Sequence, residues 1–294
     1  MRKLAETIKR VGLFANPEKV SSRSVVQKAA ALIRKNGRVA LCTEETATLC
    51  KLDLATCATV ATLGRQVDLL LIFGGDGTVL RAARDLAGTP TPILGIKVGG
   101  LGFLTAGGAR ELPETLEQIW QGEFAIESRP LIGARCRAGG HNIVRHALND
   151  FVISRGAASR LIQLDVVIDG ETLTRYRCDG LIVSSPTGST AYSLAAGGAI
   201  VSPAAEVFTL TPICPHTLSN RSVIVRLDST IKVKVVSEKI ETFLTADGQV
   251  QTALATGDVV TICRSKETVR LVRLKGSSFF ETLRAKLNWS GSNV

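Results

Sequence analysis

Short apolar runs alternate with amphipathic stretches through the first third of the chain. The apolar runs predict β-strands at residues 11–15, 39–42, 69–73 and 93–98. Apolar residues at helical spacing predict helices at 22–35 and 78–87, each followed by a terminating glycine. The run at 69–73 is apolar throughout, as expected for a strand buried on both faces. This alternation predicts an α/β domain over residues 1–106, built on a mostly parallel sheet.

The hydrophobic pattern changes to a period of two in the second part of the chain. Apolar residues alternate with polar ones between 132 and 274, and three dipeptides predict turns: Asp169-Gly170, Asp247-Gly248 and Gly257-Asp258. We therefore expect an all-β, sandwich-like domain over 107–275, with a short helix near 113–120. The amphipathic tail at 279–289 predicts a C-terminal helix, within 276–294, that packs back on the N-terminal domain.

Composition narrows the class of protein. Hydrophobic residues make up 45% and charged residues 21%, which excludes a disordered chain. The net charge of +10 favours polyanionic partners, either a polyphosphate substrate or nucleic acid. A nucleic-acid partner is not expected, because no basic run with interleaved aromatics occurs. The seven cysteines form no CxxC pair, and neither a leader nor a membrane-spanning run is evident, so a cytoplasmic protein is expected.

The pentapeptide Gly74-Gly75-Asp76-Gly77-Thr78, called the glycine loop below, stands between a predicted strand and a predicted helix. Its glycines let backbone N–H groups approach a phosphate, and the helix N-terminus adds positive charge. Thr78 is expected to cap that helix. Asp76 stands at the carboxyl end of the sheet, where it can accept a hydroxyl proton or help to hold a metal. A tight turn with a capping aspartate is the structural alternative.

Hydroxyl side chains crowd residues 184–193, called the hydroxyl loop below: Ser184, Ser185, Thr187, Ser189 and Thr190. Such groups can donate to and accept from ribose and phosphate oxygens. Tyr192 adds an aromatic face for a nucleobase. Pro186 and Gly188 indicate an irregular backbone. The alternative is a Ser/Thr-rich surface loop.

The glycine loop resembles the phosphate-binding motif shared by NAD kinases, diacylglycerol kinases, sphingosine kinases and, more distantly, phosphofructokinases. The stretch at 179–193, continuing to Gly197-Gly198, resembles the long signature of NAD kinases, a family that includes polyphosphate/ATP-NAD kinases. Residues 102–105, 211–218, 247–249 and the tail resemble further blocks of that family. The resemblance covers nearly the whole chain.

The resemblance implies a kinase that transfers the γ-phosphate of ATP to the 2′-hydroxyl of the adenosine ribose of NAD, forming NADP. Asp76 is then the catalytic base, and the donor phosphates are held by Gly74, Gly75, Gly77 and Thr78. Mg²⁺ or another divalent cation is expected to be held mainly through substrate phosphates, since the three histidines and scattered cysteines predict no protein metal site. Polyphosphate stays open as a second donor, and a homodimer or homotetramer is expected.

The resemblance also implies which residues contact NAD. Asn149 and Asp150 would grip ribose hydroxyls; the family often has Glu at the second place, so the contact of the shorter Asp150 can shift. An Asn-Asp turn is the alternative there, and a solvated helix arginine is the alternative for Arg81. The full expected set is Asp76, Gly77, Arg81, Asn149, Asp150, Arg160, Arg177, Asp179, Thr187, Thr190, Ala191, Tyr192, Ser193, Leu194, Ala195 and Gln249.

The residues are also compatible with two other functions. A lipid or sphingoid kinase would share the glycine loop. Such a kinase is expected to have a different glycine-rich segment after the fourth strand, where this chain has VGGLGFLT at residues 98–105. A dinucleotide-sensing or nucleic-acid-binding module without catalysis is the second alternative. The intact Asp76 and the intact hydroxyl loop argue against lost catalysis.

Overall fold

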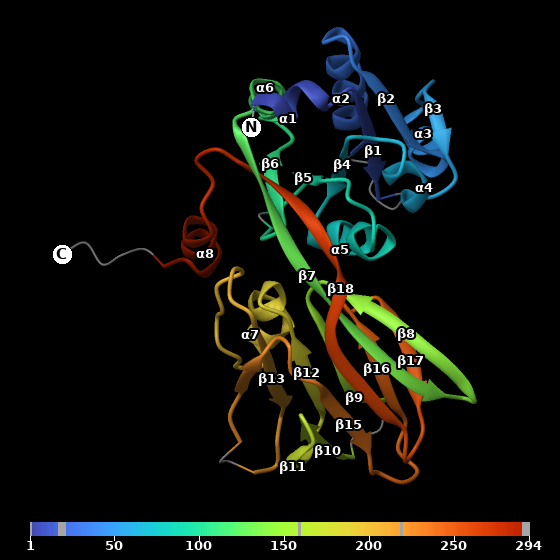
Figure 1. Cartoon of the computed structure of the whole chain (residues 1–294), viewed down its shortest axis with the longest axis vertical. Coiled ribbons are helices and arrows are strands. Elements are labelled where there is room, and N and C mark those ends of the chain that lie inside the picture. The colour runs from blue at the N-terminus through green and yellow to red at the C-terminus, as the bar shows by residue number, and fades with distance from the viewer. Residues whose placement is uncertain (1, 17–21, 101, 158–159, 218–219, 290–294) are drawn as a thin grey trace, which may run out of the picture. The chain divides into compact units, whose positions relative to one another are not determined.

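The computed structural model describes residues 2–16, 22–100, 102–157, 160–217 and 220–289. It forms two compact units, Met1–Ser128 with Val269–Val294, and Arg129–Thr268. Two long strands, β7 (Phe124–Ala138) and β18 (Val259–Leu274), begin in one unit and end in the other (Figure 1). The domain boundaries expected from the sequence, at residues 107 and 276, stay predictions.

The first unit is built on a parallel sheet. Its strands are β1 (Arg10–Ala15), β2 (Val39–Thr43), β3 (Ala55–Cys57), β4 (Leu69–Gly74) and β5 (Ile93–Lys97), in the order β5-β4-β1-β2-β3. The short strand β6 (Thr105–Gly108) pairs parallel to β5. All residues of β4 are buried, which explains its continuous apolar run. The predicted strands are confirmed; β3 has too few apolar residues to show a pattern.

Helices cover both faces of this sheet. They are α1 (Arg2–Thr7), α2 (Arg23–Lys35), α3 (Glu44–Cys50), α4 (Val60–Gly64), α5 (Asp76–Asp85) and α6 (Leu112–Gln121). Ile33 of α2 and Leu116 of α6 share a core with Leu13 of β1. The alternate residue Gly12 faces Leu63 of α4 on the other side, because successive residues of a strand point to opposite faces. Helices α1 and α6 lie side by side (Figure 1).

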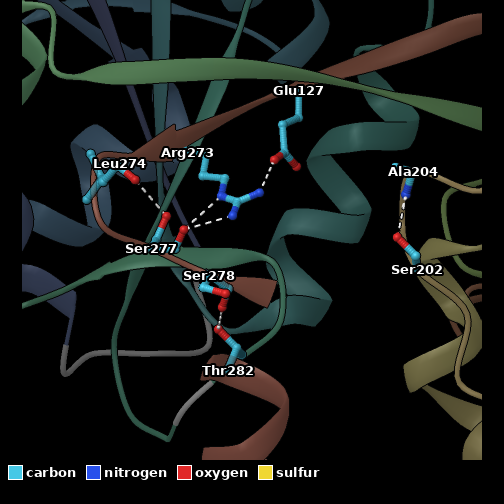
Figure 2. Close-up of polar contacts among 8 residues, drawn as sticks. All are labelled: Glu127, Ser202, Ala204, Arg273, Leu274, Ser277, Ser278 and Thr282. Carbon is cyan, nitrogen blue, oxygen red and sulfur yellow. Dashed lines mark hydrogen bonds and ion pairs between the residues drawn. The ribbon is translucent and has the colours of Figure 1, made fainter. Parts of the chain in front are cut away.

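A hydrogen-bonded turn leads from β18 into the last helix, α8 (Phe279–Leu287). The Arg273 guanidinium donates to the Ser277 carbonyl at 2.8 and 3.0 Å and also pairs with Glu127 (Figure 2). Thr282 in the first helical turn donates its hydroxyl to the Ser278 carbonyl at 3.2 Å. The predicted helix is confirmed, and it ends at Asn288 in a left-handed conformation.

The second unit consists of two antiparallel sheets. Its strands are β8 (His141–Ala147), β9 (Asp150–Arg155), β10 (Ile162–Ile168), β11 (Glu171–Cys178), β12 (Gly180–Ser184), β13 (Val207–Ile213), β14 (Val223–Arg226), β15 (Ile231–Val235), β16 (Thr242–Ala246) and β17 (Val250–Leu254). One sheet has the order β14-β13-β12-β9-β16-β17; in the other, β11, β10, β15 and β18 are neighbours. Phe151 and Phe208 from the first sheet share a core with Leu164 and Val233 from the second. This confirms the predicted β domain.

The aspartate-glycine turns of this unit take the predicted form. Asp169 and Gly170 have φ of 51° and 94°, and Asp247 and Gly248 have φ of 49° and 66°. Positive φ at both central residues is the type I′ turn of tight hairpins, which suits Asp-Gly. These turns join β10 to β11 and β16 to β17. Among the residues described, no helix combines the length and apolar character needed to cross a membrane.

Candidate active site

The glycine loop passes directly from β4 into α5. Gly75 is extended, with φ −106° and ψ −172°, and α5 begins at Asp76. The expectation that Thr78 caps this helix is wrong, because Gly75 occupies the cap position and Thr78 lies inside the first turn, where its N–H donates to the Gly75 carbonyl at 3.0 Å. The Thr78 side chain instead packs on Gly74, where an added Cβ would come within 2.3 Å of the Thr78 hydroxyl. Glycine is therefore required at position 74.

The Asp76 carboxylate is held by the segment that follows β5. One oxygen accepts from the Phe103 N–H at 2.9 Å and the other from the Leu104 N–H at 3.0 Å. A Cβ on Gly102 would lie 2.1 Å from Asp76 Oδ1, so this approach needs glycine. Each carboxylate oxygen keeps lone-pair capacity beyond one amide. Asp76 is therefore oriented and still able to accept a further proton donor.

Two more features belong to the segment that holds this carboxylate. The Thr105 hydroxyl is buried without a hydrogen-bond partner in the described structure, which indicates a place for a ligand or water. The Phe103 ring lies 6.3 Å from the Phe279 ring of α8, and Lys286 lies 4.7 Å from the Phe103 ring centroid. The sequence analysis identified residues 102–105 only as a family motif. The hydrogen bonds to Asp76 come from backbone amides, which no side chain in the sequence indicates.

Arg81 lies on the exposed side of α5, one turn after the glycine loop. Its guanidinium is 3.8 Å from Glu45 and 3.9 Å from Asp85, and it lies 5.7 Å from the Phe14 ring centroid. Ion pairs this long between half-exposed side chains are weak. Arg81 can therefore turn toward a phosphate at little cost.

In the second unit, Asn149 and the hydroxyl loop are joined through backbone contacts. The Ser185 N–H and the Ser184 hydroxyl donate to the Asn149 carbonyl at 2.8 and 3.2 Å. An added Cβ on Gly188 would come within 2.2 Å of the same carbonyl oxygen. The structure thus brings together two segments that the sequence treated as separate candidates.

Asp247, which the sequence marked as a turn residue and as part of a family block but not as a site residue, orients the start of β9. Its carboxylate accepts backbone N–H groups from Leu148, Asn149 and Asp150 at 3.2, 2.8 and 3.3 Å. Asp150 itself is 3% exposed, and burial, followed by the nearby Asp247 charge, raises its pKa to about 7. A carboxyl group that titrates near neutrality stands where the resemblance expects a ribose contact.

Most hydroxyls of the hydroxyl loop hold the loop itself. Ser189 donates to the Pro186 carbonyl at 2.8 Å, and Ser193 hydrogen-bonds with Thr211 at 3.0 Å. The exception is Thr187, whose buried hydroxyl has no partner among the described residues. The Tyr192 side chain, which begins α7 (Tyr192–Ala195), is 47% exposed. Thr187 and Tyr192 are thus the groups of this loop best placed for a ligand.

The remaining expected contacts of the second unit differ in position and exposure. Asp150 pairs with Ser184, whereas Asp179 precedes the other end of β12, about 16 Å along the strand. There Asp179 accepts from Arg155 at 2.5 Å, and this hydrogen bond raises the pKa of Arg155. The exposed expected residues are Arg160, Arg177, Ala195 and Gln249, and the partly exposed ones are Thr190, Ala191 and Leu194. Asp179 therefore lies apart from Asn149 and Asp150 within the second unit, and its partner Arg155 was not predicted.

Family models match both parts of the chain. The ATP-NAD kinase N-terminal domain matches residues 2–124, and the ATP-NAD kinase C-terminal domain matches residues 148–274. An NAD kinase of Moorella thermoacetica is 42% identical over 288 residues, which are 97% of this chain and 91% of that protein. An NAD kinase of Lachnoclostridium phytofermentans is 38% identical over 286 residues, 95% and 99% of the two chains.

Solved structures of two kinases of this kind also match the chain. Yeast NADH kinase complexed with NADH matches with a TM-score of 0.89 and 27% identity, over 98% of this chain and 89% of that one. An NAD kinase from Archaeoglobus fulgidus in complex with ATP matches with a TM-score of 0.76 and 25% identity, over 96% and 100%. These matches span both units, and the chain belongs to the NAD kinase family.

Proposed function

We propose that this protein is an NAD kinase, which transfers the γ-phosphate of ATP to the 2′-hydroxyl of the adenosine ribose of NAD. The products are NADP and ADP. Family membership over both units supports the substrates. The observation that carries the chemistry is the Asp76 carboxylate within the glycine loop, held by the backbone amides of Phe103 and Leu104.

Asp76 would act as the general base. The 2′-hydroxyl oxygen attacks the γ-phosphorus, the bond from that phosphorus to the bridging oxygen of ADP breaks, and Asp76 takes the hydroxyl proton. Both amides hold the carboxylate in one orientation before the substrate arrives, which lowers the entropic cost of reaction. The N-terminus of α5, whose first residue is Asp76, adds positive charge next to the donor phosphates.

The second unit would hold the dinucleotide. Asn149 and Asp150 offer an amide and a carboxyl group to the ribose, and Asp247 keeps their backbone in place. The unpartnered Thr187 hydroxyl and the exposed Tyr192 ring would contact the remaining polar and aromatic parts of NAD. Asp179 with Arg155 would serve a second, separate contact or a structural role.

The divalent cation would bind as a complex with ATP. In the described parts of the chain, no three His, Cys, Asp or Glu side chains gather as a metal site, and Mg²⁺ is commonly held by substrate phosphates, water and one or two carboxylates. The donor set thus fits a cation bound mainly through ATP, with Asp76 as the adjacent carboxylate. The cation would offset negative charge on the phosphates. Cytoplasmic location, expected from the scattered cysteines, is a further proposal. A homodimer or homotetramer and use of polyphosphate are proposals from family resemblance.

The decisive experiment is NADP formation by the purified protein with NAD, ATP and Mg²⁺, read through an NADP-specific dehydrogenase. Parallel assays replace ATP by polyphosphate, NAD by NADH, and NAD by diacylglycerol. We expect NADP only when NAD, a donor and a divalent cation are all present. Tight NAD binding without NADP formation would support the non-catalytic alternative, and phosphorylated diacylglycerol would support the lipid kinase.

A further inference from the structure

The Thr105 hydroxyl is a buried group that the chemistry proposed above does not use. Thr105 begins β6, directly after the segment whose amides hold Asp76. Its hydroxyl oxygen is closed off from solvent and has no hydrogen-bond partner among the described residues. A buried hydroxyl without a partner costs free energy, so its presence at this place calls for a physical reason.

Two glycines show which way the Thr105 side chain points. A Cβ added to Gly95 of β5 would lie 3.2 Å from the Thr105 methyl carbon, so this methyl group packs on β5. A Cβ added to Gly102 would lie 2.9 Å from Thr105 Oγ1 and 2.1 Å from Asp76 Oδ1. The hydroxyl and carboxylate oxygens therefore both face Gly102 and are at most about 5 Å apart, without a direct hydrogen bond.

The two amides that hold Asp76 suit its ionised form better than its protonated form. The backbone N–H groups of Phe103 and Leu104 can donate a hydrogen bond and cannot accept one. Once Asp76 has taken the proton of the attacking hydroxyl, it carries an O–H that requires an acceptor. The bonds from the two amides weaken at the same time, because the charge that strengthens them is gone. The protonated carboxyl group is then free to turn toward a new partner.

A threonine hydroxyl can provide the acceptor that the amides lack. It has one donor and two lone pairs, and it rotates to suit its neighbour. Rotation of the Asp76 and Thr105 side chains closes the remaining gap between their oxygens. A hydrogen bond that forms only as the proton moves stabilises the transition state more than the resting enzyme, and such interactions raise kcat.

We propose that the Thr105 hydroxyl accepts a hydrogen bond from protonated Asp76 and thereby supports proton transfer from the substrate. The proton leaves the ribose 2′-hydroxyl for Asp76 and passes to solvent water when the products leave, and Thr105 neither gains nor loses a proton. Thr105 is therefore a positioning residue for the base. The proposal rests on the kinase function above and deepens it by naming a second side chain that serves the proton transfer.

The first test removes the Thr105 hydroxyl. Thr105→Val keeps the shape of the side chain and should lower kcat about tenfold, while the KM values for NAD and ATP stay nearly constant. Thr105→Ser keeps the hydroxyl and should retain kcat within about twofold. Thr105→Ala should match Thr105→Val and serves if the valine variant folds poorly. Thr209→Val is the matched control and should leave kcat unchanged, because Thr209 Oγ1 of β13 is also buried without a partner in the described chain.

The pH profile of kcat/KM separates this role from a structural one. A hydroxyl that accepts from the acid favours protonation of Asp76, so Thr105→Val should move the acidic limb of the profile to lower pH. A hydroxyl that donates to the carboxylate would instead move this limb to higher pH when it is removed. The variant changes no charge. The charged groups on β5, α5 and α8, the elements around this segment, are kept: Lys97, Arg81, Arg84, Asp85, Glu281, Arg284 and Lys286.

Three results would overturn the proposal: an unchanged kcat in folded Thr105→Val and Thr105→Ala, an equal loss in Thr105→Ser, or an acidic limb that stays or moves to higher pH. NADP formation by the unmodified protein decides the kinase function separately. If that activity is absent, NMR of carboxyl-labelled aspartate, with the signal assigned by Asp76→Asn, still tests the hydrogen bond. The pH at which the Asp76 signal moves should be lower in Thr105→Val than in the unmodified protein, and an equal pH overturns the proposal.

Discussion

The Asp247 carboxylate accepts a hydrogen bond from the Asn149 backbone N–H at 2.8 Å, across 98 positions of the sequence. The same side chain also accepts from Leu148 and Asp150. It lies in the turn between β16 and β17, and the amides belong to the start of β9. The turn between β16 and β17 therefore orients Asn149 and Asp150, the expected ribose-binding pair.

Asp247→Ala should destabilise the protein and weaken NAD binding. Three buried amides lose their acceptor, which should cost about 3 kcal/mol of unfolding free energy. Urea unfolding measures the loss, and steady-state kinetics should show a raised KM for NAD. Asp247→Asn keeps one acceptor oxygen and should lose less than Asp247→Ala. An unchanged urea midpoint in Asp247→Ala would show that the contacts contribute nothing.

Asp150 should make stability depend on pH. Its folded pKa of about 7 lies above the ordinary 3.8, so the folded state binds this proton more tightly than the unfolded chain. The contribution is complete below pH 3.8 and is lost as pH rises through 7, by about 4 kcal/mol at most. Urea unfolding between pH 4 and 8 measures the slope. Asp150→Asn should remove it, and an equal slope in both proteins would contradict the assignment.

Asp76→Asn should lower kcat by about 10² to 10⁴ and leave NAD binding nearly intact, because the general base is lost while the shape is kept. Calorimetry and initial rates measure the two effects. Asp68→Ala is the control for loss of a structural carboxylate, since one Asp68 oxygen accepts two backbone N–H groups, from Lys9 and Arg10, at the other end of β4. Similar kcat losses in both variants would show that Asp76 acts only structurally.

Gly188→Ala should raise the KM for NAD about tenfold or more, because the new Cβ would push the Asn149 carbonyl from its position. Urea unfolding should show a loss of stability as well. Gly133→Ala is the control: an added Cβ there meets nothing closer than 3.9 Å. A normal KM in Gly188→Ala would mean that the position of Asn149 is unimportant for binding.

Phe279→Ala should lower kcat about tenfold, since the Phe103 segment that holds Asp76 loses a packing partner and misplacement of a catalytic group is costly. The KM for ATP should change little. Phe280→Ala, at a neighbouring residue that is 61% exposed, should have a smaller effect on kcat. A kcat for Phe279→Leu close to that of the unmodified protein, beside the lowered kcat of Phe279→Ala, would support loss of packing as the cause. An equal kcat in all these variants and the unmodified protein would contradict a role for Phe279 packing in catalysis.

Local patterns predicted the elements and several of their turns. The apolar run of β4 and the two aspartate-glycine turns depend on neighbours in sequence, so the sequence alone indicated them. The start of α5 was placed two residues late, because Thr78 is a good capping residue and Gly75 has no side chain to signal the cap. Family motifs pointed to Asp76, Asn149 and Asp150 as candidates for the site.

The sequence by itself determined the α/β-then-β order, the glycine loop and the family. Only the tertiary structure decided that Asp247 holds Asn149, that the Phe103 and Leu104 amides hold Asp76, and that most hydroxyls of the hydroxyl loop are used internally. The physical reason is that these hydrogen bonds join segments whose approach depends on strand order and register. Backbone amides are chemically alike at every residue, so no local pattern marks the ones that a distant carboxylate will meet.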